Sequence, residues 1–203
     1  MGNYWDMLMT TDEGAATYME SYGEGIGFET RHFIGSLLKD EQTVLDVGCG
    51  PGWNFDHLLK YGPAVYYRGM DYSERFVRVA SERVKPMKIF KVGDARHISE
   101  LDESFDVVIL QDCLEHTNGY EKPVNEALRV AKKRVIISFW HLEGNVGTEH
   151  INDDGNDGWG AWYDKTKWEM FLNGLLYKWW YKELSPEGKT HKWDFYIIEK
   201  ELK

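Results

Sequence analysis

Apolar residues in the middle of the chain alternate between short continuous runs and stretches with helical spacing. The short runs are rich in Val, Ile, Leu and aromatic residues, as strands are: residues 43–47, 65–70, 87–92, 105–111 and 134–139. Within the fourth run, Val-Val-Ile-Leu is continuous, which is typical of a strand buried on both faces. Repeated strand–helix units of this length predict a parallel sheet with right-handed crossovers.

The helices between the strands are defined by apolar positions three and four residues apart. Their inward faces are Phe55, Leu58 and Leu59; Phe76, Val77, Ala80 and Val84; and Val124, Ala127, Leu128 and Ala131. Ser73 is a suitable N-cap for the second helix, because its side chain can accept a hydrogen bond from a free backbone N–H. Pro86 ends that helix, and Pro123 in the first turn favours the start of the third.

Both ends of the chain depart from this alternation. Residues 28–38 carry a helical face before the first strand. Residues 141–160 are rich in Gly, Asn and Asp and predict a long loop, which at this length is usually functional or mobile. Asp164 can cap one more helix. Residues 176–184 and 193–202 then predict an antiparallel hairpin at one edge of the sheet.

Composition excludes several classes of function. A net charge of −10 disfavours a general nucleic-acid binder and adhesion to anionic membranes. No apolar run approaches the roughly 20 residues of a membrane span, and residues 1–11 lack the pattern of a signal peptide. The two cysteines make no metal-type spacing and fit reduced thiols. We therefore expect a cytoplasmic protein, monomer or homodimer, with no nucleic-acid or membrane partner.

Aromatic residues are abundant, with nine Trp and twelve Tyr. Many lie before the first strand or after the fifth: Tyr4, Trp5, Tyr18, Tyr22, Trp140, Trp159, Trp162 and Tyr163. Two interpretations stay open, because Tyr and Trp serve both: packing of a lid and a sheet edge, or an aromatic-walled pocket for a small acceptor that also includes Arg31.

A glycine turn follows directly on the first strand. The sequence is Gly48-x-Gly50-x-Gly52, with Trp53 where the dinucleotide fingerprint would have its third glycine. Such a turn lets a ligand approach bare backbone, and the helix after it offers unpaired N–H groups. The strand–turn–helix sequence therefore predicts a ligand crevice at the carboxyl ends of the strands.

Acidic residues follow the next two strands. Asp71 ends the second strand, where a carboxylate could accept hydrogen bonds from both hydroxyls of a ribose. Asp94 follows the third strand, where a carboxylate could accept from the exocyclic amine of an adenine. Both strand ends lie on one edge of a parallel sheet, so these groups converge.

As a set, these motifs resemble the class I S-adenosylmethionine-dependent methyltransferases, in particular their small-molecule, type 11-like branch. The matching pieces are Val44-Leu45-Asp46-Val47-Gly48-Cys49-Gly50-Pro51-Gly52, Asp71, Gly93-Asp94-Ala95, and Phe105-Asp106-Val107-Val108 leading into Leu114-Glu115-His116. The resemblance implies an α/β fold with a Rossmann-like, doubly wound, seven-stranded sheet in the order 3-2-1-4-5-7-6, strand 7 antiparallel.

The resemblance also implies a single domain and an activity. Residues 1–40 would be a lid, residues 41–140 the cofactor-binding core, and residues 141–203 a substrate loop, helix and hairpin. The expected activity is methyl transfer from S-adenosylmethionine to an oxygen, nitrogen or carbon of a small acceptor.

Each cofactor contact is carried over to a matching position. Asp46 and the backbone at Gly48, Cys49 and Gly50 would hold the amino-acid end. Asp71 would bind the ribose with Tyr72 beside the adenine, and Asp94 and Ala95 would meet the adenine itself. Gln111, at the end of the fourth strand, would lie near the methionine portion.

Candidates for a general base are His116, His141 and His150, because a neutral imidazole suits that task near pH 7. The stretch Asp112-x-x-Glu115-His116 resembles the segment by which some quinone-pathway O-methyltransferases bind a divalent cation. The same Leu-Glu-His segment is common in relatives that have no metal, and we expect none here.

Two other classes of function share part of this pattern. An oxidoreductase with a nicotinamide dinucleotide would use the glycine turn and Asp71, but it would leave Asp94 and the C-terminal hairpin unexplained. A non-catalytic partner could keep the fold as a scaffold, although the intact cofactor residues argue against that role.

Overall fold

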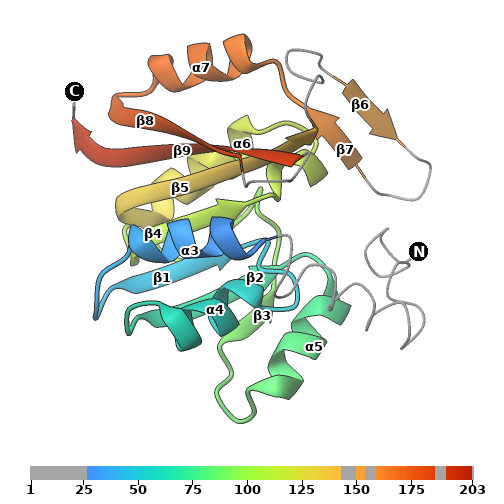
Figure 1. Cartoon of the computed structure of the whole chain (residues 1–203), viewed down its shortest axis with the longest axis vertical. Helices are drawn as coiled ribbons and strands as arrows, with labels where there is room; N and C mark the ends of the chain where they lie inside the picture. The colour runs from blue at the N-terminus through green and yellow to red at the C-terminus, as the bar shows by residue number, and fades with distance from the viewer. Residues whose placement is uncertain (1–26, 143–149, 154–158, 186–190, 203) are drawn as a thin grey trace.

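The computed structural model describes residues 27–142, 150–153, 159–185 and 191–202. Seven strands form one sheet in the order β3-β2-β1-β4-β5-β9-β8 (Figure 1). β1 to β5 are parallel, and β9 pairs antiparallel with both β5 and β8. Numbered within this sheet, the order is 3-2-1-4-5-7-6 with strand 7 antiparallel, so the predicted fold class is confirmed.

The strands of the sheet are short near its β3 edge and long near the β8 edge. Their bounds are β1 (Thr43–Val47), β2 (Tyr66–Asp71), β3 (Phe90–Val92), β4 (Phe105–Gln111), β5 (Ala131–Leu142), β8 (Tyr177–Leu184) and β9 (His191–Leu202). In β4, Val107, Val108, Ile109 and Leu110 are all at most 1% exposed. The prediction of a strand buried on both faces is therefore confirmed.

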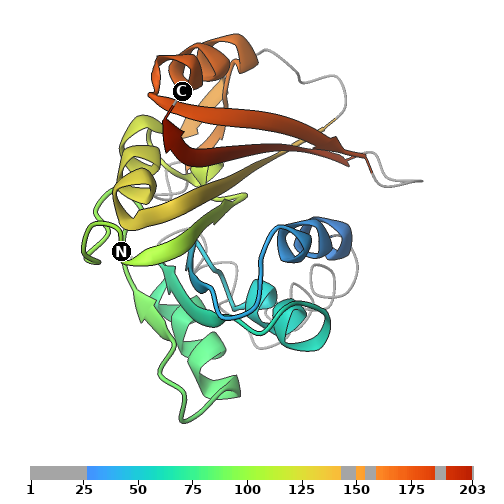
Figure 2. The same cartoon turned by 90° about the vertical axis from the view of Figure 1, so that its left-hand side faces the viewer.

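Helices cover both faces of the sheet (Figures 1 and 2). One apolar core joins the sheet to α3 (Phe28–Ser36), α4 (Trp53–Tyr61) and α5 (Glu74–Arg83). A second core joins it to α6 (Glu121–Val130) and α7 (Lys165–Gly174). Among the described residues, no helix is both long and apolar enough to cross a bilayer.

Both predicted N-caps are confirmed. The Ser73 hydroxyl accepts a hydrogen bond from the Phe76 N–H at 3.2 Å, and Asp164 accepts from the Lys167 N–H at 3.0 Å. These contacts fix the starts of α5 and α7 by satisfying N–H groups that the helix itself cannot pair. Because α5 follows β2 directly, the Ser73 cap also places the end of β2.

The structure corrects the prediction of a continuous loop over residues 141–160. β5 runs on to Leu142, and β6 (His150–Asp153) pairs antiparallel with β7 (Trp159–Trp162) in a small sheet of their own. This hairpin lies at the side of the molecule toward which β5 runs (Figure 1). Its strands have only four residues each, with no alternation long enough to separate them from a Gly- and Asn-rich loop.

β5 also begins earlier than its apolar run indicates. The helical spacing predicts Ala131 in the preceding helix, but Ala131 pairs with Phe105 as the first residue of β5. Two lysines follow Ala131 and interrupt the apolar run, so the sequence pattern does not indicate a strand at these positions. Tertiary pairing here overrides the helical periodicity.

Asp106 fastens the amino-terminal ends of three neighbouring strands. It accepts from both the backbone N–H and the hydroxyl of Thr43 at 3.0 Å, and Lys133 lies 2.8 Å from its other oxygen. Hydrogen bonding from the Lys133 ammonium and from Thr43 lowers the pKa of Asp106 to about 2.

We expect Asp106→Asn to lower the free energy of unfolding by about 1–3 kcal/mol at pH 7, since it removes charge-assisted bonds but keeps the shape. A lowered carboxyl pKa stabilises the fold above its ordinary value of 3.8, and this stabilisation is lost as the pH falls toward 2. Urea unfolding of the wild type and of Asp106→Asn should therefore show that the difference between their free energies of unfolding becomes smaller below pH 4. A difference independent of pH would contradict the role of the charge.

Candidate functional site

The glycine turn after β1 has the geometry that its sequence predicts. Gly48, Gly50 and Gly52 have φ values of 76°, 53° and 90°, in the left-handed region. A Cβ on Gly48 would lie 2.5 Å from Cβ of Cys113, whereas a Cβ on Gly50 would meet no atom within 4 Å. Gly48 is thus required for packing, and the backbone at Gly50 faces open space that a ligand can occupy.

This difference gives a prediction for two matched variants. Gly48→Ala combines backbone strain with a clash and should lower the free energy of unfolding by about 2–4 kcal/mol. Gly50→Ala has only the strain and should cost about 1–2 kcal/mol, yet it should weaken binding of S-adenosylhomocysteine at least tenfold by filling the open space. Thermal unfolding and calorimetric titration measure the two effects; unchanged affinity in Gly50→Ala would contradict the assignment of this space.

Asp71 is held in place by two backbone groups. Its Oδ2 accepts from the Gly50 N–H and its Oδ1 from the Ser73 N–H, both at 2.8 Å. A carboxylate oxygen accepts more than one hydrogen bond, so a carboxylate oriented in this way is also suited to accept from the hydroxyls of a ligand. The next residue, Tyr72, is 62% exposed, which leaves its ring available beside the predicted adenine position.

Asp94 has an intramolecular partner that the sequence analysis did not anticipate. Its carboxylate accepts from the Arg96 backbone N–H at 2.8 Å and from the Arg96 guanidinium at 2.7–3.1 Å. These bonds lower the pKa of Asp94 and keep it charged. Ala95 is partly buried against the core on the α6 face.

Asp46 lies beneath the glycine turn and is 1% exposed. Its Oδ2 accepts from the Tyr67 hydroxyl at 2.5 Å and from the Asn54 amide at 3.1 Å, and its Oδ1 has no partner among the described residues. Burial raises the pKa of Asp46 to about 6. The thiol of Cys49 is buried close by, which raises its pKa well above the ordinary value.

Polar side chains also gather where β4 ends. Gln111 donates its amide to the Thr30 hydroxyl of α3 at 3.1 Å. Asp112, with a φ of 48°, adopts the left-handed conformation that is uncommon outside glycine. Its two oxygens accept from the Ser138 hydroxyl at 2.5 Å and from the Trp193 indole N–H at 3.1 Å. Strained backbone of this kind is concentrated at functional sites.

Glu115 forms a second carboxylate beside Asp112. It is 7% exposed; its Oε1 accepts from the Trp140 N–H at 2.7 Å, and its Oε2 has no partner among the described residues. Burial and the neighbouring Asp112 raise the pKa of Glu115 well above its usual range. Arg31 of α3 is buried near Asp112, and burial lowers its pKa to about 10, so it stays charged near neutral pH.

The three histidine candidates lie in different surroundings. His116 is exposed at the end of the short helix η2 (Leu114–His116). His141 lies in β5 and His150 in β6, and both side chains are outside the described residues. Within the described ranges, no three His, Cys, Asp or Glu side chains are arranged as metal ligands, so Asp112, Glu115 and His116 do not form such a set. The base assignments stay predictions.

Residues 45–139 match the family model of a methyltransferase domain. The chain carries a class I S-adenosylmethionine-dependent methyltransferase domain. Its sheet order and its glycine turn are those expected above, and S-adenosylmethionine is the cofactor that this family implies. The open space at Gly50, the Asp71 carboxylate bound to the Gly50 N–H, and the Asp46 Oδ1, which has no partner among the described residues, fit such a cofactor.

Similar proteins extend this comparison. The chain is 32% identical over 125 residues to norajmaline N-methyltransferase of Rauvolfia serpentina. The aligned residues cover 57% of this chain and 42% of that protein. The chain is 33% identical over 95 residues to a demethylmenaquinone methyltransferase of Listeria welshimeri, covering 44% and 40%. The chain thus spans less than half the length of these two relatives. Phosphoethanolamine N-methyltransferase 2 of Haemonchus contortus, solved with S-adenosyl-L-methionine, has the same fold with a TM-score of 0.76 and 18% identity, covering 98% of this chain and 60% of that one.

Four residues from other strands and from α4 complete the site, and no sequence pattern points to them. Ser138 and Trp193 hold Asp112, and Tyr67 and Asn54 hold Asp46. Ser138, Trp193 and Tyr67 come from strands far from their partners in the chain, and Asn54 comes from α4. A single residue of these types in a strand or helix carries no signal of such a contact.

Proposed function

We propose that this protein transfers a methyl group from S-adenosylmethionine to a small amine. The observation that carries the choice of an amine is the pair of carboxylates formed by Asp112, directly after β4, and Glu115, within η2. Arg31 already lies near Asp112, but the buried Oε2 of Glu115 has no hydrogen-bond partner among the described residues, and this favours a further positively charged group beside it. An ammonium group has that charge near neutral pH.

The cofactor supplies a methyl group that is already activated on a sulfonium, so the protein mainly positions the reactants. In this proposal Asp71 holds the ribose hydroxyls, Asp94 and Ala95 meet the adenine, and the backbone at Gly48, Cys49 and Gly50 faces the amino-acid end with Asp46 beneath it. Gln111 lies near the methionine portion, and Tyr72 beside the adenine.

An amine that binds as an ammonium group has to lose a proton before its nitrogen lone pair can attack. In this proposal the proton is accepted by Glu115 Oε2, the oxygen that accepts no hydrogen bond among the described residues. The raised pKa of Glu115 brings its proton affinity closer to that of an amine, as general-base catalysis requires. Asp112, held by Ser138 and Trp193, provides the fixed negative charge that orients the ammonium.

The similar proteins support an amine acceptor without deciding it. Norajmaline N-methyltransferase and the phosphoethanolamine enzyme are both named for methylation at nitrogen, whereas the Listeria relative is named for a quinone precursor. A small acceptor also agrees with the acidic chain, which disfavours nucleic acid.

The test is a transfer assay with S-adenosylmethionine labelled in its methyl group. The acceptors are phosphoethanolamine, norajmaline and demethylmenaquinone, with NAD⁺ binding measured in parallel by calorimetry. We expect label on at least one amine and no binding of NAD⁺. Transfer only to demethylmenaquinone would overturn the amine assignment, and failure to bind S-adenosylhomocysteine would overturn methyl transfer altogether.

A further inference from the structure

The segment between β3 and β4 carries the predicted adenine contacts but has no helix of its own. Asp94 opens a tight turn that is closed by the His97 N–H donating to the Asp94 carbonyl at 2.9 Å. Before the turn, the Gly93 N–H donates to the Asp71 carbonyl at 2.9 Å, so this end is fixed to β2. Its other end is Ile98, the first buried residue after the turn.

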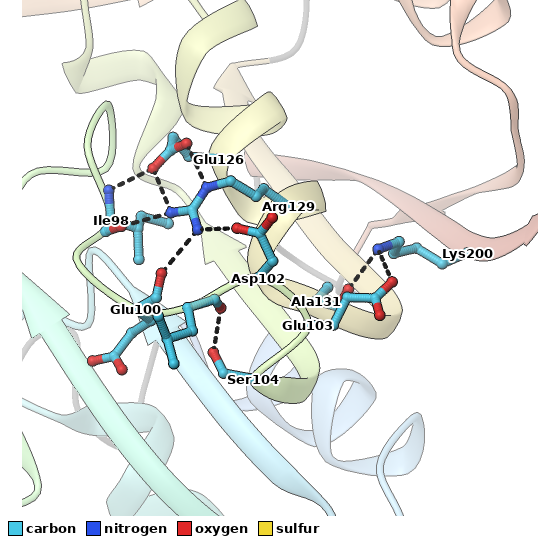
Figure 3. A network of polar contacts seen from close by, with 10 residues as sticks. Ile98, Glu100, Asp102, Glu103, Ser104, Glu126, Arg129, Ala131 and Lys200 are labelled. Atoms are coloured by element: carbon cyan, nitrogen blue, oxygen red, sulfur yellow. Dashed lines mark hydrogen bonds and ion pairs between the residues drawn. The ribbon is translucent and has the colours of Figure 1, made fainter.

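Two charged side chains of α6 hold Ile98 by its backbone (Figure 3). Glu126 accepts from the Ile98 N–H at 2.8 Å, and Arg129 donates to the Ile98 carbonyl at 2.7 Å. The two side chains are joined to each other by hydrogen bonds of 2.9 Å. This arrangement, the Glu126–Arg129 clamp, satisfies both polar groups of Ile98 with charge-assisted bonds.

The same guanidinium continues along the segment. Arg129 also donates to the Glu100 carbonyl at 2.9 Å and to the Asp102 carboxylate at 2.7 Å (Figure 3). One side chain of α6 thus sets the path of residues 98–102, where no strand or helix does so. A loop fixed before ligand binding has less conformational freedom to lose on binding.

We propose that Glu126 and Arg129 are positioning residues for the cofactor, holding the Asp94 turn in the conformation that receives the adenine. The proposal rests on the proposed function, in which Asp94 and Ala95 meet the adenine. The clamp itself does not contact the ligand: it acts through Ile98, four residues after Asp94.

A double-mutant cycle tests this role, with the affinity for S-adenosylhomocysteine measured by calorimetry. Arg129→Met keeps the apolar stem and removes every bond of the guanidinium. It should weaken binding about fivefold to tenfold in the wild-type background, and less than about twofold in the Asp94→Ala background. Glu126→Gln keeps an acceptor for the Ile98 N–H and should have a smaller effect on the affinity. It replaces Arg129→Met in the cycle if the Arg129→Met protein does not fold.

Lys200→Met is the matched control. Lys200 binds Glu103 and the Ala131 carbonyl at the far end of the same segment, without touching Ile98 (Figure 3). The Lys200→Met variant should leave the affinity for S-adenosylhomocysteine unchanged. Equal losses from Arg129→Met in both backgrounds, or none in the wild type, would overturn the positioning role. Unchanged affinity in Asp94→Ala alone would overturn the adenine assignment, whereas absence of binding by the wild type would overturn the proposed function.

Discussion

Replacing Asp71 by alanine should weaken the binding of S-adenosylhomocysteine about 100-fold. The Asp71 carboxylate is oriented before any ligand arrives, by the N–H groups of Gly50 and Ser73 at 2.8 Å. Two further charge-assisted bonds to ribose hydroxyls, together worth about 3 kcal/mol, correspond to a change of about 100-fold in the dissociation constant. Calorimetric titration measures it directly.

Two further variants show whether the loss comes from the ribose contact. Asp71→Asn keeps one oxygen and the shape of the side chain, so it should bind more tightly than Asp71→Ala but less tightly than the wild type. Glu74→Ala removes the acidic residue at the start of α5 and should leave the affinity unchanged. If Asp71→Ala binds as the wild type does, the ribose assignment is wrong.

The fold was predictable because its signals are local and repeated. The continuous apolar run of β4 and the caps Ser73 and Asp164 each depend on a few neighbouring residues. The resemblance then supplied the strand order, which periodicity alone does not give. The hairpin β6–β7 escaped prediction because its two four-residue strands are separated by Asn, Asp and Gly, which in sequence favour a loop.

The candidate site was predictable in its backbone and less so in its electrostatics. The glycine turn and Asp71 follow from spacing, since each lies at the end of a recognisable strand. The pairing of Asp94 with Arg96 could have been suspected, because a single residue separates the acid from the base in one turn. The burial of Glu115 could not, because it depends on packing that joins η2 to the Trp140 backbone of β5.

Glu115→Gln should lower the turnover of an amine acceptor about 100-fold or more, the usual range for loss of a general base. Glutamine keeps an oxygen for the Trp140 N–H but cannot take a proton. Affinity for S-adenosylhomocysteine should stay within about twofold of the wild type, because Glu115 is not among the cofactor residues. In the wild type, turnover should rise with pH through the raised pKa of Glu115, since only the ionised carboxylate accepts the proton.

Stability gives an independent readout for the same variant. A carboxyl whose pKa is raised in the folded state favours the fold while it is protonated, and this advantage is lost as the pH rises above the ordinary value of 4.5. Glu115→Gln has no such loss, so its free energy of unfolding relative to the wild type should increase from about pH 4.5 upward. Glu121→Gln, at the exposed start of α6, should show neither effect.

A Glu115→Gln protein with normal turnover would exclude Glu115 as the base and return that role to the histidine candidates. Normal turnover together with the expected gain in stability would show that the buried carboxyl is a source of strain rather than a participant in proton transfer.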